Sequence, residues 1–127
     1  MVDLYLDNNN LKNIDFLDQL DLETLWLNNN NITDISRFEA NGILPSIEYL
    51  YLSNNNIQDI SPVGNLSTLT HLNVSNNEIE NIFSLGRLTN LEELRADGNN
   101  ISDITSLLSL ELLTDLNLKN NSIDNIS

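Results

Sequence analysis

The chain has 127 residues, of which 40% are hydrophobic, and this is enough for one domain with its own core. Nineteen Asp and Glu against five Lys and Arg give a formal net charge of −14, so binding to nucleic acid or to an anionic membrane is disfavoured. The absence of cysteine and the single histidine exclude disulfides, thiol catalysis and a multi-histidine metal site. No apolar run approaches membrane-spanning length, and we expect no membrane insertion and no cofactor.

One pattern, LxxLxLxxNxIxxI, recurs along the chain. The first copy runs through Leu4, Leu6, Asn9, Leu11 and Ile14, with Met1 at the place of the leading leucine. Corresponding positions in successive copies are 21, 25, 22, 22 and 22 residues apart. The predicted repeats are 1–21, 22–46, 47–68, 69–90, 91–112 and a truncated 113–127. A single copy cannot bury its apolar face alone, so the pattern predicts a stacked array with one shared core.

Each repeat is expected to begin with a short strand. Within LxL the two leucines point inward and their neighbours point outward, because side chains alternate along a strand. After the asparagine, apolar residues recur at every third position, as at Ile79, Ile82, Leu85 and Leu88. This spacing suits short 3₁₀ or extended segments better than an α-helix. We therefore expect a parallel sheet on the concave side, 3₁₀ turns on the convex side and few α-helices.

The asparagine of each copy is predicted to form a ladder between turns. Its amide has two donors and an acceptor, which suit the backbone groups that lose their partners where the chain leaves the strand. The predicted ladder is Asn9, Asn30, Asn55, Asn77, Asn99 and Asn121. A second column lies four residues further on, where short side chains can bond the local backbone, at Asn13, Asp34, Asp59, Asn81, Asp103 and Asn125.

The second copy is irregular. It carries three extra residues, and Asn41, Gly42 and Pro45 mark a turn there. We expect a bulge on the convex side near residues 39–43. The first copy is one residue short, between Leu20 and Leu22.

These repeats resemble the leucine-rich repeat, specifically the 22-residue subclass named after a regulatory subunit of protein phosphatase-1. The resemblance covers the whole chain and implies a right-handed solenoid of the α/β horseshoe class with six repeats. The run NIQDISPVGNLSTLTHLNVSNN is similar to bacterial internalins, whose arrays repeat DIxPLxxLTxL and bind host surface receptors. The uneven first repeats and the high asparagine content are more similar to cytosolic eukaryotic proteins, such as phosphatase-regulatory or dynein-light-chain relatives. Cytoplasmic and bacterial surface locations both stay open.

The family resemblance implies protein–protein recognition through the concave sheet face. All three tyrosines, the tryptophan and the histidine fall at outward strand positions of copies one to four, whereas Phe16, Phe38 and Phe83 fall on convex segments. Aromatic residues on a rigid surface are typical of binding hot spots. The predicted partner-binding residues are Tyr5, Trp26, Tyr49, Tyr51, His71, Asn73 and Arg95.

The same face is charged in its C-terminal half, at Glu93, Arg95, Asp97, Asp115 and Lys119. Opposite charges one strand apart are expected to pair. The excess of acidic groups favours a partner protein that carries basic residues.

Neither catalysis nor calcium binding is expected. Ser75, His71 and Asp97 supply the residue types of a catalytic triad, but an open face does not exclude water, so solvated polar surface is the simpler interpretation. The columns of Asn and Asp supply oxygen ligands, yet the tandem glycines of calcium-binding β-rolls are missing.

Two questions of context stay open. The array has no polar capping unit at either end, so we expect a fragment of a longer protein with neighbouring repeats or caps at both ends. The alternative to a binding module is a structural spacer whose face binds nothing.

Overall fold

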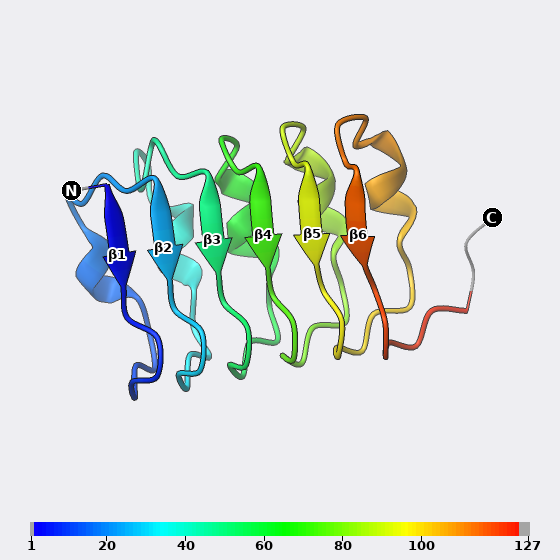
Figure 1. The fold of residues 1–127 in the computed structure, drawn as a ribbon, viewed down its shortest axis with the longest axis horizontal. Coiled ribbons are helices and arrows are strands. Elements are labelled where there is room, and N and C mark those ends of the chain that lie inside the picture. Colours follow the sequence, from blue (N-terminus) through cyan, green and yellow to red (C-terminus); the bar gives the residue numbers. More distant parts are fainter. Residues whose placement is uncertain (1, 125–127) are drawn as a thin grey trace.

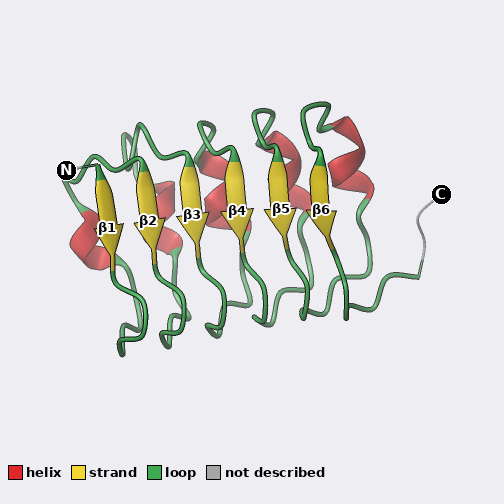
Figure 2. Ribbon diagram, in the orientation of Figure 1, coloured by secondary structure: helices red, strands yellow, loops and turns green. Residues whose placement is uncertain are grey.

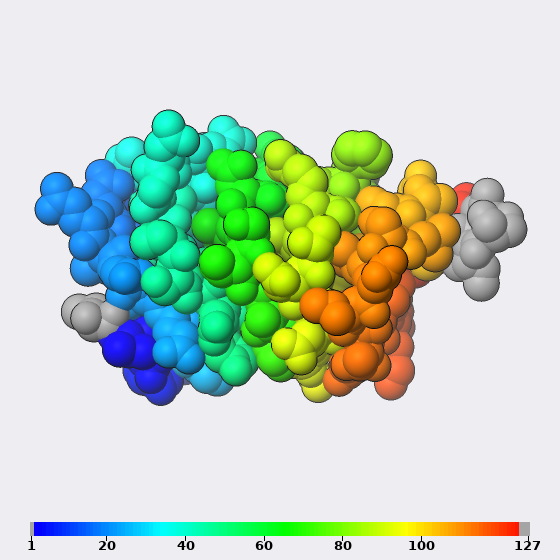
Figure 3. Space-filling model, turned by 90° about the horizontal axis from the view of Figure 1, so that it is seen from above, coloured from blue at the N-terminus to red at the C-terminus, as the bar shows by residue number. Residues whose placement is uncertain are grey.

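A computed structural model describes residues 2–124 and shows one six-stranded parallel sheet whose strands follow chain order (Figure 1). The strands are β1 (Asp3–Tyr5), β2 (Thr24–Trp26), β3 (Tyr49–Tyr51), β4 (His71–Asn73), β5 (Glu93–Arg95) and β6 (Asp115–Asn117). Each strand pairs with the next along the chain, which confirms the predicted stack of repeats. Figure 3 shows the repeats side by side in one elongated body.

The sheet is in strict register through its central leucines. These residues, Leu4, Leu25, Leu50, Leu72, Leu94 and Leu116, face one another from strand to strand. In β2 to β4 the central leucine is buried while both of its neighbours are partly exposed. A shift of one residue would turn the leucines outward, so burial of the leucine column sets the register.

Short 3₁₀ helices cover the side of the core opposite the sheet (Figure 2). They are η1 (Asp15–Leu17), η2 (Ser36–Glu39), η3 (Ser61–Asn65), η4 (Phe83–Arg87) and η5 (Thr105–Ser109). Residues 2–124 contain no α-helix. The expectation from the three-residue apolar spacing is therefore confirmed, because a 3₁₀ helix places every third side chain on the same side.

The later 3₁₀ helices pack closely because glycine occupies the contact. A Cβ atom added at Gly64 would lie 2.7 Å from the carbonyl oxygen of Ser84, and one added at Gly86 would lie 2.8 Å from that of Ser106. Both distances are shorter than real Cβ contacts, so a larger residue would push neighbouring repeats apart.

The repeated asparagine joins consecutive turns. The Nδ2 of Asn55 donates to the carbonyl oxygen of Leu27 in the preceding repeat (3.0 Å) and to that of Leu52 in its own repeat (3.1 Å). Its Oδ1 accepts from the amide of Ile32 (3.0 Å). The same set of bonds forms at Asn30, Asn77, Asn99 and Asn121. Each of these side chains therefore holds two repeats together.

Asn9 departs from the expected column. It is exposed, and its Nδ2 donates only to the nearby carbonyl oxygens of Leu6 and Asp7. Within residues 2–124 its side chain therefore bridges no second repeat.

The second polar column starts the 3₁₀ segments. The Oδ1 of Asp34 accepts from the amide of Ser36 (2.9 Å), two residues further on. Asn13, Asp59, Asn81 and Asp103 make the equivalent bond, whereas Asn125 lies outside the described residues. These bonds satisfy an amide that has no partner within the helix.

The extra residues of the second repeat form the predicted turn. Asn41 and Gly42 lie in it, and Gly42 has a φ of 73°, which glycine adopts without strain. The chain returns to the core at Leu44, which is buried. Phe38 is fully buried within η2, so this phenylalanine is ordinary core.

The leucines of the last described repeat are more exposed to solvent than expected. Leu116 was expected to be core but is 41% exposed, because no strand pairs with the far side of β6 in residues 2–124. Leu112, in the segment between η5 and β6, is 53% exposed. Among the same residues, none of the helices has the length and hydropathy needed to cross a membrane.

Candidate functional site

The outward strand residues form two parallel rows on the sheet, which together we call the concave sheet face. The first row is Asp3, Thr24, Tyr49, His71, Glu93 and Asp115. The second row is Tyr5, Trp26, Tyr51, Asn73, Arg95 and Asn117. The structure therefore brings all seven predicted binding residues onto this face, with Tyr49 and His71 in the first row and the other five in the second.

Three aromatic rings stack along the second row. The ring of Trp26 lies between those of Tyr5 and Tyr51, with centroid distances of 5.7 and 4.1 Å and both interplanar angles 17°. Neighbouring strands lie about 4.8 Å apart, so rings that leave paired strands at matched positions meet face to face. Tyr5 ends the stack and is 66% exposed.

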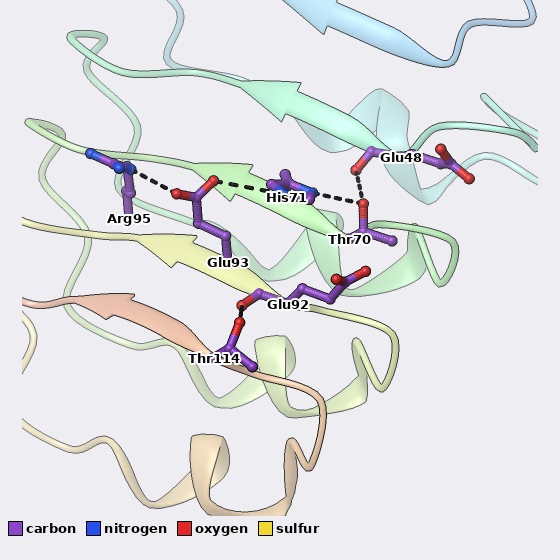
Figure 4. A network of polar contacts seen from close by, with 7 residues as sticks. All are labelled: Glu48, Thr70, His71, Glu92, Glu93, Arg95 and Thr114. Atoms are coloured by element: carbon purple, nitrogen blue, oxygen red, sulfur yellow. Dashed lines mark hydrogen bonds and ion pairs between the residues drawn. The ribbon is translucent and has the colours of Figure 1, made fainter.

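A second aromatic pair lies in the first row. The rings of Tyr49 and His71 stack with centroids 4.7 Å apart. The Nδ1 of His71 lies 2.9 Å from the hydroxyl oxygen of Thr70, and its Nε2 lies 4.0 Å from a carboxylate oxygen of Glu93 (Figure 4). These contacts hold the imidazole in one orientation.

The charged residues in the C-terminal half of the concave sheet face do not pair across strands as predicted. Arg95 Nε donates to Glu93 Oε1 at 3.2 Å, and both residues belong to β5 (Figure 4). Residues two apart on a strand share a face, so this pairing within one strand replaces pairing of the arginine with an acid one strand away. The Arg95 side chain is 49% exposed and stays accessible. A pair this exposed stabilises the fold by at most about 1 kcal/mol.

Tyr51 is a neutral phenol at physiological pH. Burial in the stack raises its pKa above the ordinary value of 10.0, the charge of Glu93 and the neighbouring Tyr49 add to this, and Arg95 opposes it. Its hydroxyl can therefore both donate and accept a hydrogen bond.

Polar residues just after the strands bond to one another across the sheet. The amide of Asn28 donates to Asp7 Oδ1 (2.7 Å), and the Ser53 hydroxyl donates to Asn28 Oδ1 (2.7 Å). The Ser75 hydroxyl donates to Asp97 Oδ1 (2.6 Å), and Ser75 is buried. The interpretation of Ser75 as solvated surface was wrong, because its hydroxyl pairs with the carboxylate of the next repeat.

The residue types of a catalytic triad are present without the geometry of one. A triad requires the serine hydroxyl to bond to histidine and the histidine to bond to the acid. Here the hydroxyl of Ser75 bonds to Asp97, while His71 contacts Thr70 and Glu93. Among residues 2–124 no three His, Asp or Glu side chains are grouped so as to hold a metal ion.

The residue before each ladder asparagine has a role that the sequence analysis did not identify. Asn8, Asn29, Asn54, Asn76 and Asn120 all have a φ between 56° and 61°, and Gly98 at the same place has a φ of 70°. Asparagine and glycine are the residues that adopt this left-handed conformation most readily. Asn29 therefore belongs to the turn and not to the concave sheet face. The sequence did carry a signal for this left-handed conformation, because Gly98 replaces asparagine at this place in the fifth copy.

A parallel sheet of short strands, 3₁₀ helices behind it and an asparagine at every turn define a leucine-rich-repeat solenoid. Residues 20–65 and 45–87 each match the family described as Leucine Rich repeats (2 copies), which covers more than half of the chain. The chain belongs to the leucine-rich repeat family. No curated protein sequence matches it.

Solved structures of bacterial leucine-rich-repeat proteins are similar to this fold. An internalin from Listeria monocytogenes is 34% identical over 82% of the chain, with a TM-score of 0.76. Internalin C2 from the same species is 27% identical over 99% of the chain, with a TM-score of 0.67. A leucine-rich-repeat protein from Leptospira interrogans, at 23% identity, 98% coverage and a TM-score of 0.73, shows the fold alone. The chain spans 30%, 74% and 32% of these three proteins.

Proposed function

We propose that this chain is a protein-recognition module that binds a partner protein through the concave sheet face. The observation that carries the proposal is the stacked row Tyr5–Trp26–Tyr51 on an open sheet. Tyrosine and tryptophan supply large contact areas and dominate binding hot spots. The pair Tyr49–His71 widens the aromatic surface in the adjacent row.

The face is ordered before any partner arrives. Leu25, Leu50 and Leu72 on the opposite side of the same strands are at most 1% exposed, so the backbone beneath the rings is rigid. The stacked rings already restrict one another. Ordering of side chains is a main entropic cost of association. Because these side chains are already ordered, binding of a partner incurs little of this cost.

The charged half of the face favours a partner with basic groups. In this half Glu93, Asp97 and Asp115 outnumber Arg95 and Lys119 on and beside the strands, and Asp3 adds a further acidic group at the other end of the face. Complementary charge increases the rate of encounter and selects the orientation of the partner. Asn73 and Arg95, next to the aromatic row, are the polar contacts in this proposal.

The similarity to internalins favours a second candidate, a bacterial surface adhesin that recognises a host protein. The identity of 34% to an internalin supports it. In this candidate the chain acts at a bacterial surface, whereas an intracellular scaffold of the 22-residue phosphatase-regulatory subclass acts in the cytoplasm. The 3₁₀ helices and the 22-residue spacing of the later repeats support that subclass. Both candidates use the same face, and a non-binding spacer is the remaining alternative.

A quantitative pull-down tests the proposal. The double variant Trp26→Ala/Tyr51→Ala removes the centre of the aromatic row, and Phe16→Ala/Leu108→Ala removes exposed apolar side chains from the opposite side as a matched control. A partner that is captured by the wild type and the control but lost by the first variant is the expected result. Hydrogen exchange of the complex should then show protection in β1 to β4.

Two outcomes contradict the proposal. Equal capture of every partner by all three proteins supports the spacer alternative. Loss of capture by the control as well places binding elsewhere on the surface. Circular dichroism of each variant separates either outcome from unfolding.

A further inference from the structure

The most exposed aromatic side chain of residues 2–124 lies on the side opposite the sheet. Phe83 begins η4 and is 79% exposed. The other repeats carry polar residues at this place, namely Asp15, Ser36, Ser61 and Thr105. Phe83 is not part of the core, because Leu85 is the buried residue of the same 3₁₀ helix. An exposed apolar side chain alone is ordinary, so its surroundings decide what it means.

Phe83 lies between two shallow hollows that separate neighbouring repeats. The first, about 480 Å³, is lined by Gln58, Asp59, Ser61, Glu80, Asn81, Phe83 and Ser84. The second, about 300 Å³, is lined by Glu80, Asn81, Phe83, Ser102, Asp103, Thr105 and Ser106. A third hollow adjoins them through Glu80 and includes Glu78. The phenyl ring therefore stands as a ridge between two depressions.

The ionisable groups that line these hollows are all acidic. Asp59, Glu78, Glu80 and Asp103 line them, and no Lys or Arg does so. Glu80 makes no hydrogen bond or ion pair with any described residue. The amide and hydroxyl of Thr105 bond to Asp103 and lower its pKa below 3.8, so this carboxylate is charged at neutral pH.

One polar atom beside the ring has no partner. The hydroxyl oxygen of Ser84 is buried and forms no hydrogen bond with the described residues. Ser84 lines the same hollow as Phe83 and packs against Gly64 of the preceding repeat. A buried polar group without a partner costs stability. Because this oxygen is closed off from solvent, Ser84 lines the hollow through its other atoms.

We propose that Phe83, together with Asp59, Glu80, Ser84 and Asp103, forms a second docking site that binds a basic segment of a partner protein. We call these five residues the Phe83 patch. An arginine or lysine of the segment packs its aliphatic part and its charge against the Phe83 ring. Its neighbours pair with Glu80 and the flanking aspartates. The patch is on the opposite side of the core from the concave sheet face, so the two sites act independently.

A peptide titration followed by amide NMR tests this site. The probe is a ten-residue peptide of alternating Arg and Leu at physiological salt, and the control peptide carries Glu in place of Arg. The expected shifts from the Arg peptide are confined to amides of residues 58–61, 78–84 and 100–106, while the Glu peptide causes none. Shifts on β1 to β6, or shifts spread evenly over the acidic surface, would overturn the proposal.

Matched variants test the role of Phe83 itself. Phe83→Ser introduces the residue found at the equivalent positions 36 and 61, so it should fold normally. We expect it to weaken binding of the Arg peptide about two- to fivefold, the effect of losing an exposed cation–aromatic contact. Glu80→Gln should weaken binding as well. Phe16→Ser, which removes a partly exposed phenylalanine from η1, should have no effect.

The variants separate this site from the proposed function. Trp26→Ala/Tyr51→Ala should bind the Arg peptide with unchanged affinity, even where it loses its protein partner. If Phe83→Ser binds as tightly as the wild type, or if Phe16→Ser is equally impaired, the Phe83 patch is not the docking site. Neither result bears on recognition through the concave sheet face.

Discussion

The indole ring of Trp26 and the phenol ring of Tyr51 lie face to face, with centroids 4.1 Å apart and planes 17° apart. The two residues are partners in the register of β2 and β3. Their contact follows from the leucine columns on the other side of the strands, because burial of Leu25 against Leu50 sets the register that aligns the rings. The core thus positions the candidate binding surface.

The coupling between these rings can be measured. In a double-mutant cycle of Trp26→Ala and Tyr51→Ala, we expect a coupling free energy of about 0.5–1.5 kcal/mol from urea unfolding, since stacked aromatic pairs contribute about this much beyond burial. Tyr49 is two residues from Tyr51 and outside the stack, so a cycle of Trp26→Ala with Tyr49→Ala serves as the control. A coupling near zero in the first cycle would show that the rings do not stack in solution.

The ladder asparagines should differ in their effect on stability. Asn77→Ala removes bonds to the carbonyl oxygens of Leu52 and Val74 and leaves the amide of Ile57 without its partner. We expect a loss of about 1–3 kcal/mol in the free energy of unfolding. Asn9→Ala is the matched control, because Asn9 is exposed and bridges no preceding turn. Equal losses in the two variants would contradict the bridging role.

The leucine column should be costly to truncate. Leu72 is 1% exposed in the middle of the sheet, and Leu72→Ala should lower the free energy of unfolding by about 2–5 kcal/mol because it leaves a cavity. Leu108 is 72% exposed on η5, so Leu108→Ala should change stability by less than about 0.5 kcal/mol. Denaturation of both variants under the same conditions checks the contrast.

Two aspartates of the second polar column should link stability to acid pH. The amide and hydroxyl of Ser36 lower the pKa of Asp34 below 3.8, and those of Thr105 do the same for Asp103. A lowered pKa in the folded state contributes stability above pH 3.8, and this contribution is lost as the pH falls through the lower, folded-state pKa.

Replacement of both aspartates isolates this contribution. Asp34→Asn/Asp103→Asn keeps the accepting oxygen, as Asn13 and Asn81 do in other repeats, but cannot bind the proton. Its free energy of unfolding should therefore fall less steeply than that of the wild type below about pH 4. Asp21→Asn/Glu111→Gln makes the same change in net charge elsewhere on the surface. If the two double variants have the same pH profile, the linkage is absent.

Most of the fold could be predicted because it repeats. Six copies of one pattern identify the leucine column, the 3₁₀ segments and the asparagine turns, since each copy must bury the same face against its neighbours. The inserted turn at Asn41 and Gly42 was recognisable because it interrupts that pattern. Leu116 was misjudged, because a pattern within one repeat does not reveal whether a neighbour covers it.

The sequence predicted which residues lie on the concave sheet face, but it did not predict which of their side chains contact one another. Alternation along the strand places Trp26 and Tyr51 on one face, whereas their stacking depends on strand spacing and register. Arg95 pairs within its own strand, and Ser75 turns to Asp97, because each side chain bonds to the nearest partner in space. Such choices depend on distances that no linear pattern contains.

The run of four asparagines from Asn28 to Asn31 shows most clearly which roles the sequence determines and which roles only the tertiary structure decides. The sequence by itself determined that Asn30 is the ladder residue, because asparagine recurs at this place in all six copies. Only the tertiary structure decided that Asn28 accepts from Ser53 and that Asn29 holds a left-handed turn. The letters are identical, and their roles differ because each backbone position offers a different conformation and a different neighbour.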